Sequence, residues 1–456
     1  MPEMLRKFPV LFLLVPLVVL VLCADRQNWN VFLGTPAPLD SIPYVYRAVV
    51  QDYAKPCPRS WRVEVELVPD RRHAYLYLQR DSTRSLPDLG DTLLVRAHFK
   101  QGGLLGNFDY GRYLRLNGIA GTAFVRSRDW QIVGTAVSIP LRLRPLMWQY
   151  AAYERYKELG LSGDALATTA ALTLGYKDDL DPQLKSSFQK AGAAHILAVS
   201  GLHTGILYCV LFFLFTCFGL YPPLYEARWH QRIVSGLIVA LLIAYAMLTG
   251  GSPSVVRSVL FVALLEIAKI WHRQPFTLNA LFVTAFLILF FRPSDLFSVS
   301  FQLSFAAVAS ILLINPTLRA LFPIPAPPHS IFHYIIRYIL GLLTVSIAAQ
   351  IFTLPLTLHY FSQTSNLFFV TNLMVVPLAF LLMVSALLLL TLGWLPLIDK
   401  VLATFTSWIA DAMNRSAGWV ESLPHAVTYA ELSLPAMAGM YLIIFLFVIL
   451  LNRIVQ

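Results

Sequence analysis

The chain has 456 residues, of which 57% are apolar and 13% are charged. Soluble globular proteins average about 45–50% apolar and 25% charged residues, so this composition excludes an ordinary soluble enzyme. An aromatic content of 13% also excludes intrinsic disorder, which requires few large apolar groups. The net charge of +10 attracts anions such as lipid headgroups or nucleic acid, although the surplus Lys and Arg that orient a membrane protein are sufficient to explain it.

The first apolar run, residues 8–23, follows two basic residues and fits either a secretory signal or a membrane anchor. A small-residue cleavage site is missing, and Leu22 stands where a lipoprotein signal has a small residue before Cys23. We therefore predict that residues 1–24 form an uncleaved anchor with the N-terminus inside.

Residues 25–137 alternate apolar and polar side chains over short stretches that Pro, Gly and Asp interrupt, as half-buried antiparallel strands do. The predicted strands lie at residues 44–51, 61–67, 73–78, 92–99, 119–125 and 130–137. This spacing predicts a small β-barrel or sandwich. Because the segment follows an inward-anchored helix, we place it on the exterior side of the membrane.

Residues 138–160 mix Arg and Lys with Leu, Trp and Tyr, which is typical of an amphipathic helix on the membrane surface. Beyond it, residues 161–456 hold runs close to the ~20 apolar residues that cross a bilayer. These runs lie at residues 205–221, 233–249, 255–271, 276–291, 297–314, 338–358, 367–393 and 434–451. Segment 402–424 is too polar for a simple span, so we predict an amphipathic or re-entrant helix there. The predicted fold class is a polytopic α-helical membrane protein with an inserted all-β exterior domain.

A polar cluster precedes the run at 205–221 and contains His195, Ser200, Gly201 and His203. On a helix Ser200 and His203 share a face. One interpretation is therefore that they are the nucleophile and the base of an intramembrane serine protease. Against it, no nearby acid would orient the histidine. The two histidines lie about 12 Å apart along an unbroken helix, too far to share a metal ion. The structural alternative is a helix start with small residues for close packing.

The stretch Gly251-Ser252-Pro253 interrupts a second apolar region, and Arg257 follows it. Irregular backbone at membrane depth is tolerated only inside protein or beside a wet cavity. A charge in a span costs roughly 2.5–3.5 kcal/mol on insertion scales and marks a pathway or a buried partner, unless the arginine lies at the membrane surface. Further polar residues within spans are Gln302, Gln350 and Asn372, which fit either contacts between helices or the wall of a polar conduit.

These motifs together resemble the ComEC-type competence proteins, from about residue 40 almost to the end of the chain. The similar stretches follow the family's order: residues 106–119 (GNFDYGRYLRLNGI), 174–181 (LGYKDDLD), 195–203 (HILAVSGLH), 251–257 (GSPSVVR), 301–306 (FQLSFA), 350–355 and 372–377.

The resemblance implies an OB-fold exterior domain and a membrane domain that conducts single-stranded DNA into the cell during natural transformation. It implies a path past the cluster at 195–203, Gly251 to Arg257, and the three polar span residues. Many relatives carry a metallo-β-lactamase-like nuclease domain, and we find no such motif before Gln456. We therefore expect no enzymatic activity and no cofactor. The expected partners are single-stranded DNA, membrane lipid, a separate nuclease, a cytoplasmic motor and other uptake proteins. The expected location is the cytoplasmic membrane of a bacterium.

OB folds bind single strands through basic grooves and aromatic rings. The β-rich segment offers such residues, although most of its aromatic residues fit a core equally well: Arg59, Trp61, Arg62, Arg71, Arg72, Tyr75 and Tyr77, with Tyr53, Phe108 and Tyr110. The competing functions are the intramembrane serine protease and a small-molecule permease with an exterior binding module. The sequence predicts no oligomeric state.

Overall fold

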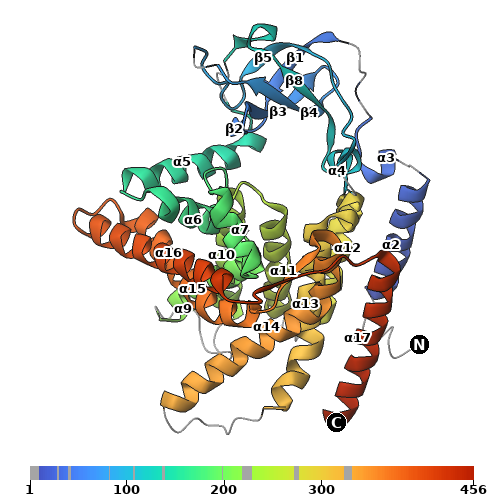
Figure 1. The fold of residues 1–456 in the computed structure, drawn as a ribbon. Coiled ribbons are helices and arrows are strands. Elements are labelled where there is room, and N and C mark those ends of the chain that lie inside the picture. The colour runs from blue at the N-terminus through green and yellow to red at the C-terminus, as the bar shows by residue number, and fades with distance from the viewer. Residues whose placement is uncertain are drawn as a thin grey trace. The chain divides into compact units, whose positions relative to one another are not determined.

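The computed structural model describes residues 10–27, 30–37, 39, 43–81, 83–105, 108–135, 139–197, 199–217, 228–271, 277–322 and 331–455. The chain divides into two compact units (Figure 1). The sheet unit comprises residues 1–148 with 286–298, and the helical unit comprises residues 149–285 with 299–456.

The sheet unit begins with an apolar helix and continues into short strands. Its elements are α2 (Leu11–Arg26), α3 (Asn30–Leu33), β1 (Tyr44–Val50), β2 (Lys55–Pro56), β3 (Ser60–Val68), β4 (Arg72–Gln79), β5 (Thr92–Ala97), β6 (Leu104–Leu105), β7 (Phe108–Asp109), α4 (Tyr110–Leu116), β8 (Ile119–Val125), η1 (Ser127–Asp129), β9 (Trp130–Gly134), η2 (Leu141–Leu143) and η3 (Pro293–Phe297). All six predicted strands are present, because alternation along a half-buried strand follows directly from its pleat.

The main sheet has the strand order β8-β4-β3-β1-β5-β9. All its neighbours are antiparallel except β4 and β8, which run parallel. An isolated bridge between Lys100 and Thr122 joins the chain after β5 to β8. The prediction of an all-β, antiparallel domain therefore differs from the structure in two features: the parallel pair, and α4 before β8. Period-two alternation reports which face is buried but not the direction of the partner strand.

The core of the sheet unit lies on one face of these strands. Alternate residues of β3 and β4, including Val63, Val65, Leu76 and Leu78, are fully buried. Burial of side chains of this size contributes about 1.5–3 kcal/mol each. Of the intervening residues, which project from the opposite face, Arg62, Glu64, Tyr75 and Tyr77 are partly buried, whereas Ser60 and Glu66 are buried.

The helical unit consists almost entirely of helices, joined at two places by short strands. Its elements are α5 (Arg144–Glu158), α6 (Gly163–Thr173), α7 (Pro182–Lys190), α8 (Ala194–Leu197), α9 (Gly201–Cys217), α10 (Arg228–Leu248), α11 (Pro253–Ile270), α12 (Thr277–Phe291), α13 (Val299–Ala320), α14 (Ile331–Phe361), β10 (Gln363–Ser365), α15 (Phe368–Leu392), α16 (Ile398–Ser422), β11 (Val427–Tyr429) and α17 (Leu434–Val455). The first residues of α5 and the last of α12 belong to the sheet unit.

Within the described residues, each predicted hydrophobic run contains a helix; residues 218–221 and 276 of these runs lie outside the described residues. By length and composition, four helices of the described chain can cross a membrane: α10, α13, α14 and α15. Helices α9, α12 and α17 are apolar over shorter stretches, and α11 has 18 residues but carries Arg257, Glu266 and Lys269. The chain is therefore a polytopic helical membrane protein with an N-terminal sheet domain.

Two segments that the sequence marked as amphipathic pack into the protein. In α5, Tyr153 and Tyr156 are at most 1% exposed and join a core with residues of α6 and α15. A helix on the membrane surface would place its rings at the water boundary, and these two rings do not lie there. Helix α16 packs against α15 and α6. It does so through a buried stripe with helical spacing: Ala403, Thr406, Ile409, Ala410, Met413, Ala417 and Val420.

Candidate functional site

The outward side of β3, β4 and β8 carries aromatic rings around one arginine. The register places Arg62 of β3 opposite Tyr77 of β4, and Tyr77 opposite Phe124 of β8. The Arg62 guanidinium lies 5.2 Å from the ring centroid of Tyr75. Phe124 is 59% exposed. Arginine and exposed rings on neighbouring strands are the groups on which nucleic-acid bases stack.

Helix α4 adds two tyrosines to this surface. The Tyr77 and Tyr110 hydroxyl oxygens are 3.5 Å apart, and the Tyr110 ring stacks on Tyr113 with centroids 6.1 Å apart. Burial, with a smaller contribution from the Glu64 carboxylate, raises the pKa of Tyr75 to about 12, which keeps its phenol neutral. We define the aromatic face as Arg62, Tyr75, Tyr77, Tyr110, Tyr113 and Phe124.

The other predicted DNA-binding residues of this unit lie elsewhere. Trp61 has the opposite strand parity to Arg62, packs against the core, and has Arg80 over its ring at 5.1 Å. Arg71 and Arg72 lie at the β3–β4 turn, where Arg72 pairs with an aspartate, and Arg59 is an exposed residue before β3. Of the predicted residues, the structure therefore unites Arg62, Tyr75, Tyr77 and Tyr110.

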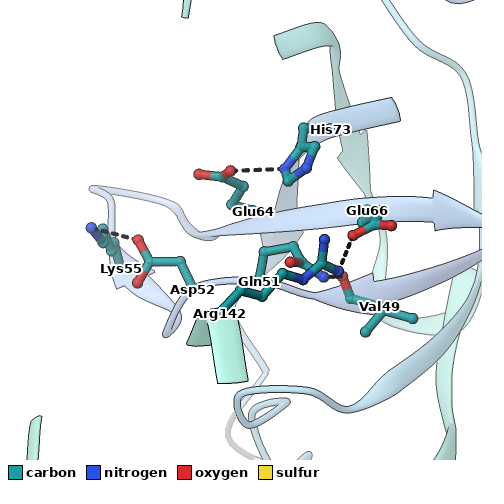
Figure 2. A network of polar contacts seen from close by, with 8 residues as sticks. All are labelled: Val49, Gln51, Asp52, Lys55, Glu64, Glu66, His73 and Arg142. Carbon is teal, nitrogen blue, oxygen red and sulfur yellow. Dashed lines mark hydrogen bonds and ion pairs between the residues drawn. The ribbon is translucent and has the colours of Figure 1, made fainter. Parts of the chain in front are cut away.

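Two glutamates of β3, Glu64 and Glu66, lie beside the aromatic face, and Figure 2 shows their ion pairs. Glu64 follows Arg62 on the outward side of β3, and its carboxylate oxygen lies 3.1 Å from Nδ1 of His73. The next outward residue, Glu66, pairs with Arg142 of η2 (Figure 2). The Glu66 charge is thus met by an arginine, whereas Glu64 faces a histidine that is charged only when protonated.

The motif at residues 106–119 forms α4 and its ends, although Gly106 and Asn107 lie outside the described residues. The Asp109 side chain accepts a hydrogen bond of 2.8 Å from the Arg112 backbone N–H and so caps the helix. A Cβ on Gly111 would stand 2.3 Å from the carbonyl oxygen of Gly102, so this position requires glycine. Local folding of α4 therefore explains Asp109 and Gly111 of this motif.

Three motifs of the helical unit converge on Gly175. A Cβ there would stand 3.2 Å from Val199 Cγ2 and 3.6 Å from the Thr249 carbonyl oxygen, and φ is +75°. Residues 174–181, 195–203 and 249–257, which are distant in sequence, therefore meet at one place. Both the close approach and the left-handed backbone favour glycine at this point.

Ser200 and His203 form a helix cap at the start of α9. The Ser200 backbone N–H donates to His203 Nδ1 at 2.9 Å, and Ser200 Oγ accepts from the Leu202 N–H at 3.3 Å. This is the reciprocal arrangement of a capping box, with histidine as the third helical residue. Ser200 Oγ also lies 3.1 Å from Nδ1, but the backbone N–H already occupies that acceptor. Within the described residues Nε2 has no partner, so no carboxylate orients the ring for catalysis.

The neighbouring polar residues differ in exposure. His203 is fully buried, whereas His195 on α8 and Lys177 are exposed. Between α8 and α9 the helix is interrupted, so the predicted separation along one unbroken helix does not apply. Within the described residues no group of three or more His, Cys, Asp or Glu side chains is placed to hold a metal ion.

Gly201 sits where α9 meets α11. A Cβ at this position would stand 3.1 Å from Ser258 Oγ and 4.0 Å from Ser258 Cβ. Tight spacing of this kind requires a small residue, as in other membrane helix contacts.

The break between α10 and α11 is made by two glycines and a proline. Gly250 and Gly251 both have φ of +68°, and Pro253 is the first residue of α11 after Ser252. Arg257, one turn later, is 5% exposed. Its Nη2 donates to the Ser300 carbonyl oxygen at 3.1 Å and to Ser300 Oγ at 2.8 Å. Arg257 therefore ties α11 to α13 inside the protein.

The three polar span residues each join neighbouring elements. Gln302 of α13 accepts a hydrogen bond of 2.8 Å from Tyr360 of α14. Gln350 of α14 donates to Thr364 of β10 at 3.3 Å, and Asn372 of α15 donates to Ser346 of α14 at 3.2 Å. Glu266 and Lys269 of α11 form a further polar group with residues of α9 and α10.

A model of the family described as "Competence protein" matches residues 172–454. The chain is 32% identical over 218 residues to ComE operon protein 3 of Bacillus subtilis, covering 48% of this chain and 25% of that protein. It is 32% identical over 222 residues to Recombination protein 2 of Haemophilus influenzae (48% and 27%), and 30% over 154 residues to Competence protein ComA of Neisseria gonorrhoeae (34% and 22%).

These matched regions span about a quarter of each curated relative. No solved structure is similar to the chain. The family match covers most of the helical unit, including the motifs that meet at Gly175, and it extends over more than half of the sequence. The chain belongs to the Competence protein family.

Proposed function

We propose that this protein conducts single-stranded DNA across the cytoplasmic membrane of a bacterium during natural transformation. The observation that carries the proposal is membership of the helical unit in the Competence protein family. In this proposal the chain transports the strand, a separate nuclease degrades the other strand, and a cytoplasmic motor pulls the strand inward. The sheet unit lies outside and the loops richest in Lys and Arg lie inside.

The strand order of the sheet unit supports an OB-type barrel. Five strands, β1, β3, β4, β5 and β8, are linked in the order β8-β4-β3-β1-β5, and the Lys100–Thr122 bridge connects the two ends. An OB fold is a five-stranded, partly open barrel that binds oligonucleotides on the face of its second and third strands. Here these are β3 and β4, which carry Arg62, Tyr75 and Tyr77 of the aromatic face.

For the helical unit, the proposed path passes the junction at Gly175. Exposed His195 and Lys177 supply positive or polar groups to a polyanion there, and Gly201 and Gly251 keep backbone accessible. Such groups replace part of the hydration that phosphates lose in a pore. Arg257, His203, Gln302, Gln350 and Asn372 act in this proposal by holding the surrounding helices.

Deletion of the gene tests the proposal most directly. Linear DNA carrying a selectable marker should no longer reach the cytoplasm in the deletion strain, while DNA binding to the cell surface persists. The purified full chain in lipid nanodiscs should bind a single strand with an affinity that falls with salt, by about 0.7 in log K per tenfold salt for each phosphate neutralised. Normal transformation of the deletion strain contradicts the proposal.

The serine protease alternative rests on the 3.1 Å between Ser200 Oγ and His203 Nδ1. Ser200→Ala separates the two functions. A protease would lose all cleavage, whereas loss of a helix cap lowers the stability by only about 1 kcal/mol. We expect Ser200→Ala to retain most DNA uptake. For the permease alternative, the structure offers no comparable feature among the described residues.

A further inference from the structure

A buried polar group joins α9, α10 and α11 far from the motifs discussed above. Glu266 of α11 is 1% exposed, and its carboxylate accepts hydrogen bonds from Tyr208 of α9 at 2.7 Å and from Ser235 of α10 at 2.7 Å. Lys269, one turn further along α11, donates to Glu266 at 2.6 Å and to the Tyr208 hydroxyl at 2.7 Å. We call these four residues the Glu266 clasp.

The clasp is fully connected. One carboxylate oxygen receives Tyr208 and Lys269, the other receives Ser235, and the Tyr208 hydroxyl both donates and accepts. A buried carboxylate is tolerated when it is paired and hydrogen-bonded in this way. The partners come from three helices, so the group links them rather than stabilising α11 alone.

Helices α9 and α11 touch at two matching heights. The first contact is Gly201 against Ser258, and the second is Tyr208 with Glu266. These contacts are seven residues apart on α9 and eight apart on α11, or about 10 and 12 Å at 1.5 Å per residue. The two helices therefore run in the same direction. They meet closely at Gly201, which has no side chain, and are hydrogen-bonded to each other at the clasp.

We propose that Glu266 is a positioning residue for DNA uptake, which acts by holding α9 against α11 through the Tyr208 hydroxyl. The proposal rests on the proposed function, because α9 begins with Gly201 and His203, beside the junction at Gly175. Without the Tyr208 hydrogen bond, only the close contact of Gly201 with Ser258 and apolar packing hold α9 against α11, and α9 can move away from α11 along its whole length. The path then loses its defined width although the helices remain in the membrane.

Single-atom variants separate the arms of the clasp. Tyr208→Phe removes the hydroxyl that holds α9 and leaves the Glu266–Lys269 pair with Ser235 intact. Ser235→Ala releases α10 instead. Thr216→Val is the matched control on α9, because the Thr216 hydroxyl donates only to the carbonyl oxygen of Phe212 in its own helix. Glu266→Gln removes the charge itself.

The position of α9 can be measured by disulfide formation. A Cβ at residue 201 would lie 4.0 Å from the Cβ of residue 258, which is within the range of a disulfide. The double variant Gly201→Cys with Ser258→Cys therefore reports contact of α9 with α11. It is made in a chain from which the four native cysteines have been removed. We expect Tyr208→Phe and Glu266→Gln to slow this cross-link severalfold in intact membranes, and Ser235→Ala and Thr216→Val to leave it unchanged.

DNA uptake is measured separately in strains that carry the native cysteines. Tyr208→Phe and Glu266→Gln should lower uptake at least tenfold at unchanged membrane abundance, and Thr216→Val should leave it unchanged. Unchanged cross-linking in Glu266→Gln, or equal slowing by Ser235→Ala and Tyr208→Phe, overturns the proposal. If deletion of the whole gene leaves transformation normal, the proposed function fails, while the cross-linking result still decides whether the clasp positions α9.

Discussion

Replacement of Tyr77 by alanine tests whether the aromatic face binds DNA. Tyr77 is central in this face: it stands opposite Arg62 and Phe124 in the sheet and its hydroxyl lies 3.5 Å from that of Tyr110. Stacking of one base on an aromatic ring contributes about 1–3 kcal/mol, so loss of the ring should weaken binding about 5- to 150-fold. Because the residue projects away from the core, the sheet unit should stay folded.

The assay is fluorescence anisotropy of a labelled oligothymidine with the full chain in nanodiscs, at low salt. Tyr44→Ala is the matched control, because Tyr44 is 65% exposed on β1, outside the strands of the aromatic face. We expect Tyr44→Ala to bind as the unchanged protein does. If Tyr77→Ala and the unchanged protein bind equally, with identical thermal unfolding, the aromatic face is not the binding surface.

Three further outcomes follow from the same reasoning. Glu64→Gln should tighten DNA binding about threefold at low salt. The Glu64 carboxylate lies two residues from Arg62, about 7 Å along the strand, and at that distance it repels a phosphate by about 0.6 kcal/mol in water. The control Asp70→Asn, at the hairpin turn, should have less effect in the same anisotropy assay. Arg257→Ala and Arg257→Glu should abolish DNA uptake at unchanged membrane abundance, with Arg257→Lys intermediate because it keeps the charge but loses the planar fork; normal uptake by Arg257→Glu contradicts this. A reporter fused near Arg84 should be exterior and one near His272, which lies outside the described residues, cytoplasmic; a cytoplasmic signal at Arg84 reverses the topology.

The strands of the sheet unit were predictable because their physics is local. Burial of every second side chain is a property of one strand, and it is visible at Val63, Val65, Leu76 and Leu78. The parallel pairing of β4 with β8 is not local, since it depends on the course of the chain between them. For that reason Phe124, whose neighbours come from β4, could not be linked with Tyr77 before the fold was known.

The predicted binding residues of the sheet unit could have been sorted further from the sequence. Trp61 and Arg62 are adjacent on one strand and must project to opposite faces. Only Arg62 can therefore share a surface with Tyr75 and Tyr77, as the structure has it. The remaining arginines lie at turns, where alternation gives no direction.

The spacing of Ser200 and His203 supported two interpretations because a nucleophile–base pair and a helix cap both place the side chains three residues apart. Only the backbone distinguishes them, through the donation of the Ser200 N–H to Nδ1. The sequence allowed a helix start at this point as an alternative, but the spacing of the two residues fits both interpretations. The break between α8 and α9, and with it the role of Ser200 as a cap, required the three-dimensional structure.

The charged residues within the apolar helices of the helical unit are bound to other groups of the protein. Arg257 donates hydrogen bonds to Ser300, and Glu266 and Lys269 are bound to each other and to Tyr208. A charge that crosses into lipid must find such a partner, so the charges deepest in apolar sequence are the ones most completely engaged by protein. On the proposed function, the groups that meet DNA are then found at helix ends and breaks, where water reaches them. His195, exposed on the short helix α8, has this position, and substitution there should alter uptake without loosening the helices.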